Sequence, residues 1–231
     1  SYFSLQVEHI DDIEAAKKTM IQPFNIVDGR LFFIRLLRDK EHFYFFQNVH
    51  HTIFDGSSQG IMLADIEKVY NGEPIEAEQL TMAQLAVDEE KQRETAAFEE
   101  DKKWYAENFD CGDCYSPLLP DRDDKQFVDA LLTRTMAVDM DRVDAFCKAT
   151  GVFRSSVFTA AYSYLLAKYN NEQQALFSTL HNGRADKRCS HTVGMMVKTV
   201  PVYARFDDET RVHDFIKAGE EQMKGCRQHD S

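Results

Sequence analysis

Two early runs of aromatic and β-branched residues have the pattern of paired strands. Residues 31–37 and 42–49 are rich in Phe, Tyr, Ile and Val, and the polar segment 39–41 separates them. Because these residue types favour strands and a short polar segment favours a chain reversal, the pattern predicts a β-hairpin.

A helix is predicted after the second run. Ser57-Ser58 suits an N-cap, and apolar residues follow at helical spacing as far as Asn71-Gly72, which suits a helix end. The segment between strand and helix is His50-His51-Thr52-Ile53-Phe54-Asp55-Gly56. Both histidines are therefore expected at a strand-to-helix junction.

The remaining chain mixes helix-like and strand-like segments. A polar helix is predicted over residues 88–109, where acidic and basic side chains alternate as on a solvated helix face. Strands are predicted over residues 131–138, 175–180 and 199–206, and helices over residues 139–151, 155–169 and 211–226. Because the order lacks regular βαβ spacing, we expect the α+β class, with mixed sheets covered by helices.

Residues 111–120 have the composition of a connector between compact units. They include Gly112, Pro117 and Pro120 beside acidic neighbours. This composition predicts an N-terminal lobe over residues 1–115, which carries the two histidines, and a C-terminal lobe over residues 116–231.

Composition narrows the partners and the location. The formal net charge of -12 disfavours nucleic acid as a partner, and the longest apolar runs are too short and too often interrupted to cross a membrane. No export signal is recognised after Ser1, and five cysteines are an odd number for a disulfide framework. We expect a cytoplasmic protein that contacts neither nucleic acid nor membrane.

No metal site or directly bound cofactor is predicted. Cys111 and Cys114 form a single CxxC pair, whereas a structural zinc site needs four ligands and neither the loop nor Cys147 completes the set.

His51 is the candidate catalytic residue. Imidazole exchanges protons near neutral pH, and a turn at a strand end can present it to a cleft on a rigid backbone. Asp55 could contact His51 or bind an arginine elsewhere and lock the loop, and we favour the second role. Gly56 suggests unusual backbone dihedrals or a close approach by another segment.

Three segments resemble the condensation domains of nonribosomal peptide synthetases. Residues 48–57 look like the HHxxxDG signature of that family, and residues 23–31, beginning Pro23-Phe24-Asn25-Ile26, resemble the approach to it. Residues 193–201 resemble the VGxFVNTxP segment, with Met196 in place of Phe and Lys198 in place of Asn. We expect these two departures to alter a channel wall rather than the chemistry.

The resemblance implies site roles, partners and a reaction. It implies two chloramphenicol-acetyltransferase-like lobes with His51 in a tunnel between them, entered from opposite faces by donor and acceptor carrier proteins. His51 would help an acceptor amine attack a donor thioester on 4'-phosphopantetheine, with neighbouring synthetase domains as further partners. By the same resemblance His50, Asp55 and Gly56 are structural, and Arg184, in Asn182-Gly183-Arg184, is the partner of Asp55.

The family pattern extends beyond both ends of this sequence. The chain is therefore expected to be an internal fragment of an acyltransferase, with both lobes truncated, and the activity of the isolated fragment is left open. Three alternatives stand beside peptide-bond formation: another HHxxxDG acyltransferase, an epimerisation domain, and a non-catalytic carrier-docking module.

Overall fold

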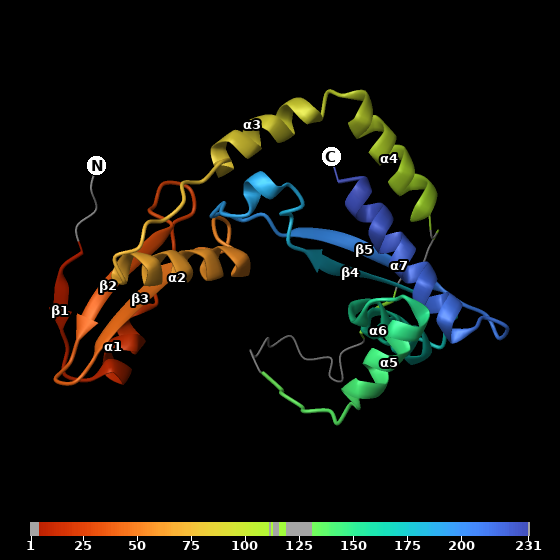
Figure 1. Cartoon of the computed structure of the whole chain (residues 1–231), viewed down its shortest axis with the longest axis horizontal. Helices are drawn as coiled ribbons and strands as arrows, with labels where there is room; N and C mark the ends of the chain where they lie inside the picture. The colour runs from red at the N-terminus through yellow and green to blue at the C-terminus, as the bar shows by residue number, and fades with distance from the viewer. Residues whose placement is uncertain (1–4, 111, 113–115, 119–130, 231) are drawn as a thin grey trace. The chain divides into compact units, whose positions relative to one another are not determined.

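The computed structural model describes residues 5–110, 112, 116–118 and 131–230. Contacts divide the chain into two compact units, shown as ribbons in Figure 1. The first unit contains residues 1–86 and 182–197, and the second contains residues 87–181 and 198–231. The lobe boundary predicted between residues 115 and 116 falls beside residues outside the described range, so it stays a prediction.

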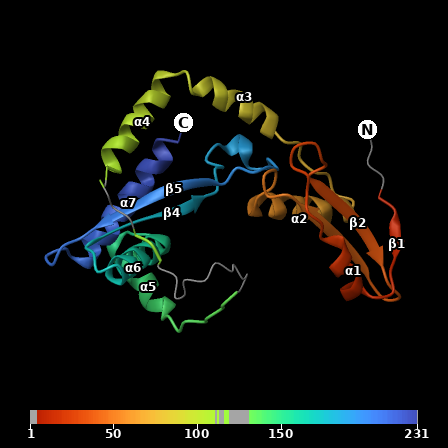
Figure 2. The ribbon, with the colours of Figure 1, turned by 180° about the vertical axis from the view of Figure 1, so that it is seen from behind.

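The first unit is built on a small mixed sheet. Strand β1 (Val7–His9) pairs in parallel with β2 (Phe32–Arg38), which pairs antiparallel with β3 (Phe43–Val49). Figure 1 shows α2 (Gly56–Tyr70) crossing in front of this sheet, and Figure 2 shows α1 (Ile13–Met20) from the opposite side. The predicted hairpin is confirmed, whereas β1 and α1 were not foreseen.

The hairpin is held by its register and by one buried side chain. Phe32 pairs with Val49 at one end and Arg38 with Phe43 at the other, so the seven-residue strands match along their length. Leu37 is fully buried, while the Arg35 guanidinium pairs with Glu8 across the parallel pair. This register brings the end of β3, and the histidines after it, beside the start of β2.

Helix α2 begins at Gly56, directly after Asp55, which is earlier than the sequence predicted. Its N-cap is Asp55, whose carboxylate accepts a hydrogen bond of 2.8 Å from the Ser58 backbone N–H, so the predicted Ser57-Ser58 cap is wrong. Aspartate is as good a cap as serine. The predicted end is confirmed, because the helix closes at Tyr70 and Gly72 has a φ of 76°.

The long polar helix predicted over residues 88–109 is two helices. They are α3 (Met82–Gln92) and α4 (Ala96–Asn108), with the break at residues 93–95. Thr95 is the N-cap of α4, and its hydroxyl accepts from the Phe98 N–H. A threonine side chain that bonds nearby backbone competes with continued helix. The solvated polar face is present on both helices, where acidic side chains form exposed pairs with lysines and arginines.

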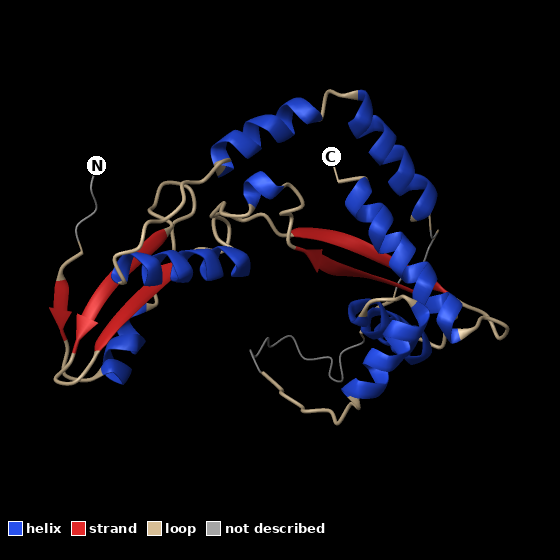
Figure 3. Ribbon diagram, in the orientation of Figure 1, coloured by secondary structure: helices blue, strands red, loops and turns tan. Residues whose placement is uncertain are grey.

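The second unit packs helices against a two-stranded sheet. Strands β4 (Gln174–His181) and β5 (Lys198–Arg205) are antiparallel, α6 (Arg154–Tyr169) packs on β4, and α7 (Val212–Gln228) packs on β5 and α6. Figure 3 shows these elements by type. One core cluster joins Val152, Ala160 and Ile216. The mixture of helices with small sheets confirms the α+β class.

The N-termini of two helices in the second unit are capped in different ways. α5 (Met140–Thr150) has the predicted Asp139 N-cap and ends at Gly151, whose φ is 74°. α6 has no capping side chain of its own. Glu220 of α7 supplies one instead, because its carboxylate accepts from the Phe153 N–H at 2.8 Å and the Ser156 hydroxyl at 2.7 Å. The cap of α6 is therefore a tertiary contact.

The strand predicted over residues 131–138 is absent from the structure. These residues carry no strand assignment, and Leu131 and Met136 are 94% and 78% exposed. Residue type favours a strand there, but a strand needs a neighbour to satisfy its backbone.

No helix among the described residues has the length and apolar character needed to span a membrane.

Helices α4 and α7 meet at Trp104, the single tryptophan of the chain. The Trp104 ring stacks on His229 with centroids 4.5 Å apart, and His229 Nδ1 lies 2.8 Å from the Asp101 carboxylate. A Cβ added at Gly225 would collide with the Trp104 ring, whereas one at Gly219 of the same helix would meet nothing. Glycine at 225 therefore permits close helix packing.

We expect Gly225→Ala to destabilise the protein by about 1–3 kcal/mol, because the methyl group overpacks this contact. Gly219→Ala is the matched control and should stabilise α7 by up to about 1 kcal/mol through helix propensity. Urea unfolding followed by Trp104 fluorescence measures both. Equal effects of the two substitutions would contradict the packing explanation.

Candidate functional site

The two histidines lie on a tight turn that leaves β3. The His50 N–H donates to Leu31 O at 2.9 Å, and the Ile53 N–H donates back to His50 O at 3.1 Å. His50 Nδ1 accepts from the Thr52 N–H at 3.2 Å and lies 2.8 Å from the Thr52 hydroxyl. An accepting Nδ1 puts the proton of neutral His50 on Nε2. His50 thus stabilises the turn.

His51 has a different environment on the same turn. Its side chain is exposed, and among the described residues no hydrogen bond to its ring is found. The backbone around it is held by the bonds of its neighbours, so the imidazole is displayed from an ordered turn. Its catalytic role stays a prediction.

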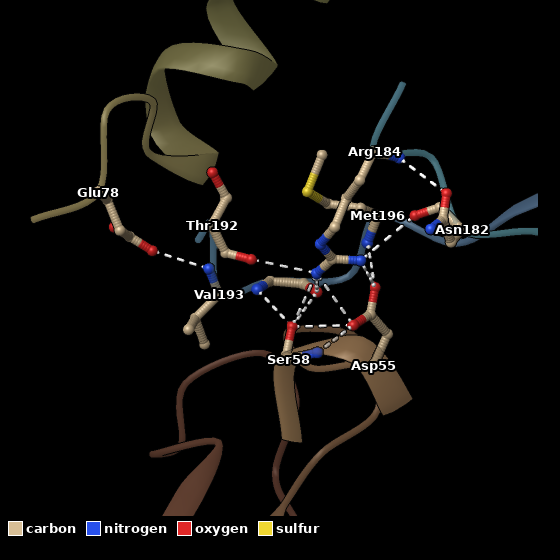
Figure 4. Close-up of polar contacts among 9 residues, drawn as sticks. Asp55, Ser58, Glu78, Asn182, Arg184, Thr192, Val193 and Met196 are labelled. Carbon is tan, nitrogen blue, oxygen red and sulfur yellow. Dashed lines mark hydrogen bonds and ion pairs between the residues drawn. The ribbon is translucent and has the colours of Figure 1, made fainter. Parts of the chain in front are cut away.

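Asp55 and Arg184 are brought together across 129 positions of sequence. Arg184 Nη1 donates to Asp55 Oδ2 at 2.8 Å and Nη2 donates to Oδ1 at 3.0 Å, a bidentate ion pair shown in Figure 4. The Arg184 side chain is 6% exposed and the Asp55 side chain is 0% exposed. Of the two roles considered for Asp55, the structure displays the arginine contact.

Backbone groups complete the coordination of the Asp55 carboxylate. It accepts from the Ser58 N–H at 2.8 Å and from the Met196 N–H at 3.0 Å. Burial alone raises the pKa of the Asp55 carboxyl, but the hydrogen bonds from Arg184, Ser58 and Met196 outweigh burial and hold that pKa well below its usual range. Asp55 is therefore a permanent anion that cannot serve as a proton donor near neutral pH.

The Arg184 guanidinium also fixes the connection between β4 and β5. It donates to backbone oxygens of Asn182, Thr192 and Gly194, at 3.2, 3.1 and 3.4 Å. Gly183 has a φ of 67°, and a Cβ there would collide with the Met196 carbonyl. Only glycine lets the chain turn so closely past residue 196.

The contacts of three side chains in this site, those of Ser58, Thr192 and Glu78, were not foreseen from the sequence. The buried Ser58 hydroxyl bonds Asp55, Arg184 and Gly194, the Thr192 hydroxyl donates to Leu80 O at 2.5 Å, and Glu78 accepts from the Val193 N–H at 2.7 Å. Residues 182–197 thus lie against both the start of α2 and residues 78–80. The one available signal was the spacing of Ser58 three residues after a capping aspartate.

Gly56 does not behave as the sequence suggested. It is the first residue of α2, it is absent from the residues with positive φ, and a Cβ there would meet no atom within 4 Å. Neither unusual dihedrals nor a close approach therefore explains this glycine.

No group of three or more His, Cys, Asp or Glu side chains among the described residues is placed to hold a metal ion. Cys111 and Cys114, the CxxC pair, lie outside the described residues.

Comparison with known proteins gives one consistent result. The family model described as "Condensation domain" matches residues 2–231. Tyrocidine synthase 3 of Brevibacillus parabrevis is 25% identical over 228 residues, covering 93% of this chain and 3% of the relative. Gramicidin S synthase 2 of Brevibacillus brevis is 26% identical over 222 residues, covering 92% of this chain and 5% of the relative.

Solved structures share the fold. The condensation domain of monacolin K polyketide synthase superposes with a TM-score of 0.76 at 16% identity, over 98% of this chain and 55% of that chain. The X-domain from teicoplanin biosynthesis also gives 0.76, at 17% identity over 99% of this chain and 55% of that chain. The chain thus spans about half of each solved neighbour.

We expect Asp55→Ala to cost roughly 3–5 kcal/mol of stability, because it leaves the buried Arg184 charge without its partner. The lost stability of Asp55→Ala should appear mainly as misfolding and poor soluble yield. Soluble yield and unfolding midpoint equal to the parent protein, with function lost, would contradict this expectation.

The lowered pKa of the Asp55 carboxyl predicts that the free energy of unfolding depends on pH. Because its folded pKa is below the unfolded value of about 3.9, its stabilising contribution is complete above about pH 5 and is lost as pH falls through the folded pKa. The free energy of unfolding should therefore fall more steeply between about pH 6 and pH 3 in the parent protein than in Asp55→Asn. Urea unfolding at both pH values measures the difference, and equal slopes would argue against it. Asp39, whose pKa is lowered to about 2 chiefly by the Tyr44 hydroxyl, is present in both proteins. Its contribution to the pH dependence therefore cancels in the comparison.

Proposed function

The chain belongs to the condensation-domain family, and we propose from this membership that it carries the His51 part of a site that forms amide bonds between carrier-bound thioesters. The observation that supports this most directly is the exposed imidazole of His51 on a turn that is hydrogen-bonded on both sides. The reaction class is acyl transfer: the acceptor amine bonds to the donor carbonyl carbon, and the carrier thiol leaves with a proton.

His51 has two chemically distinct roles open to it. It orients the acceptor amine for attack, or it removes the proton that the amine carries after attack. General-base help typically contributes about 10²- to 10⁴-fold to a rate. An amine that is already neutral needs orientation first, and orientation alone supplies several kcal/mol of barrier reduction in well-placed reactants. His51→Ala removes both roles.

Asp55 and Arg184 serve the proposed site as structure. The carboxylate is fully engaged by Arg184, Ser58 and Met196, so it has no capacity left to hold an imidazole. Its contribution is to lock residues 182–197 onto the α2 N-terminus that follows the histidine turn. The backbone N–H after Asp55 is our candidate for stabilising the developing oxyanion.

The proposed substrates arrive covalently carried rather than free. Donor and acceptor groups would be held as thioesters on the 4'-phosphopantetheine arms of carrier proteins, with neighbouring synthetase domains supplying them. No residue of this chain is assigned to a directly bound cofactor. The relatives named tyrocidine synthase 3 and gramicidin S synthase 2 favour peptide-bond formation over the other acyltransfer readings of HHxxxDG.

We expect His51→Ala to lower amide formation by about 10²- to 10⁴-fold while the protein remains folded, because the His51 side chain is exposed and forms no hydrogen bond to the described residues. The assay uses the natural protein that contains this sequence, with donor and acceptor carriers loaded with a panel of aminoacyl groups. Mass spectrometry of the carrier-bound product follows the rate.

His42→Ala is the matched control, since His42 is an exposed histidine on the β2–β3 turn of the same unit. It should leave the rate unchanged. Undiminished product from His51→Ala would make the HHxxxDG segment structural in this protein and favour the carrier-docking alternative. Absence of product from the parent protein with every aminoacyl group would reject the proposed reaction.

A further inference from the structure

Ser58 is the point at which three segments of the site meet. It is fully buried, although it sits one turn into a helix whose neighbours Ser57 and Gln59 are more accessible. Its hydroxyl lies 2.8 Å from Asp55 Oδ1, 2.8 Å from Gly194 O, 2.9 Å from Gly194 N and 3.0 Å from Arg184 Nη2. Figure 4 shows these contacts converging on one oxygen.

The hydrogen-bonding capacity of this hydroxyl is used completely. A serine hydroxyl has one donor and two acceptor lone pairs. The oxygen accepts from the Gly194 N–H and from Arg184 Nη2, and its single proton goes to Asp55 Oδ1 or to Gly194 O. The Gly194 N–H is therefore held by this side chain whichever acceptor takes the Ser58 proton.

Removal of the hydroxyl would leave one group without a partner. Asp55 Oδ1 keeps the Ser58 N–H and Arg184 Nη2, and Gly194 O keeps Arg184 Nη2 at 3.4 Å. For the Gly194 N–H, Ser58 is the hydrogen-bond acceptor found among the described residues. The role specific to Ser58 is thus to hold the Gly194 N–H.

Neighbouring bonds keep the segment attached on both sides of Gly194. Glu78 holds the Val193 N–H and Asp55 holds the Met196 N–H. Gly194 itself is buried, and the Met82 side chain occupies the space where a Cβ would lie. Loss of the Ser58 hydroxyl should therefore shift residues 194–196 locally rather than release the segment.

We infer that Ser58 is a positioning residue, which sets the backbone of residues 194–196 relative to the α2 N-terminus and the His51 turn that leads into it. The inference rests on the proposed amide-forming function, because the rate of that reaction is what a shift of residues 194–196 beside the α2 N-terminus would change. Ser58 touches no substrate in this assignment and acts through Gly194.

The test compares Ser58→Ala with Ser57→Ala in the natural protein that contains this sequence, using the loaded-carrier assay. Ser57 is the adjacent serine, and the structure shows no hydrogen bond from its side chain to the described residues. We expect Ser58→Ala to lower the saturating rate per folded molecule by about 10- to 100-fold, the scale of an error in placing reacting groups. Ser57→Ala should leave that rate within about twofold of the parent protein.

A second comparison separates positioning from lost stability. Leu37→Val destabilises the same unit at a buried sheet position remote in sequence from Ser58. At a temperature where all variants are folded by circular dichroism, Leu37→Val should retain the parent rate while Ser58→Ala does not. Ser58→Cys, which keeps a side-chain atom at the γ position but makes it a weaker acceptor, should show the same loss and replaces Ser58→Ala if that variant does not fold.

Two results would overturn the inference independently of the proposed function. If the parent protein forms amide and Ser58→Ala and Ser58→Cys retain its saturating rate per folded molecule, Ser58 is structural only. If Leu37→Val loses as much rate as Ser58→Ala, the loss reports instability. A parent protein that forms no amide with any loaded group instead rejects the proposed function itself.

Discussion

The buried ion pair between Asp55 and Arg184 is the interaction on which the described site depends. Two charges are removed from water, which is favourable only when geometry and additional hydrogen bonds compensate for lost hydration. Here the carboxylate accepts from both guanidinium nitrogens, from two backbone N–H groups and from the Ser58 hydroxyl, and the guanidinium donates to backbone carbonyls of three residues. Either partner alone would keep its hydrogen bonds to the backbone but would be a buried charge without its counter-charge.

This constraint explains why a connection between two strands belongs to a unit other than theirs. β4 and β5 are in the second unit, yet residues 182–197 between them are compact with the first. Arg184, Gly183 and Gly194 are the residues that make this placement possible, through charge at the first position and the absence of a Cβ at the other two.

The division of labour among the site residues follows from burial. Asp55, Ser58 and Arg184 are buried and bonded to one another, so they are suited to holding geometry. His51 is exposed with its ring uncommitted to the described residues, so it is suited to contact with a substrate. In the proposed amide-forming reaction the buried residues hold the site in place, and His51 contacts the reacting groups. His50, held by Thr52, belongs with the residues that hold the site in place.

Elements whose signals lie within a short stretch of sequence could be predicted from the sequence alone. The β2–β3 hairpin, the Asp139 cap and the helix after the histidines follow from residue type and spacing, and the HHxxxDG pattern predicts a role for His51. Tertiary structure decided the rest. Thr95 divides a helix because its side chain bonds the backbone, and Glu220 caps α6 from another helix. Residues 131–138 form no strand, because no strand among the described residues pairs with them. Ser58, Thr192 and Glu78 become part of the site only when residues 182–197 fold back on α2, since hydrogen bonds between segments so distant leave no periodic trace in the chain.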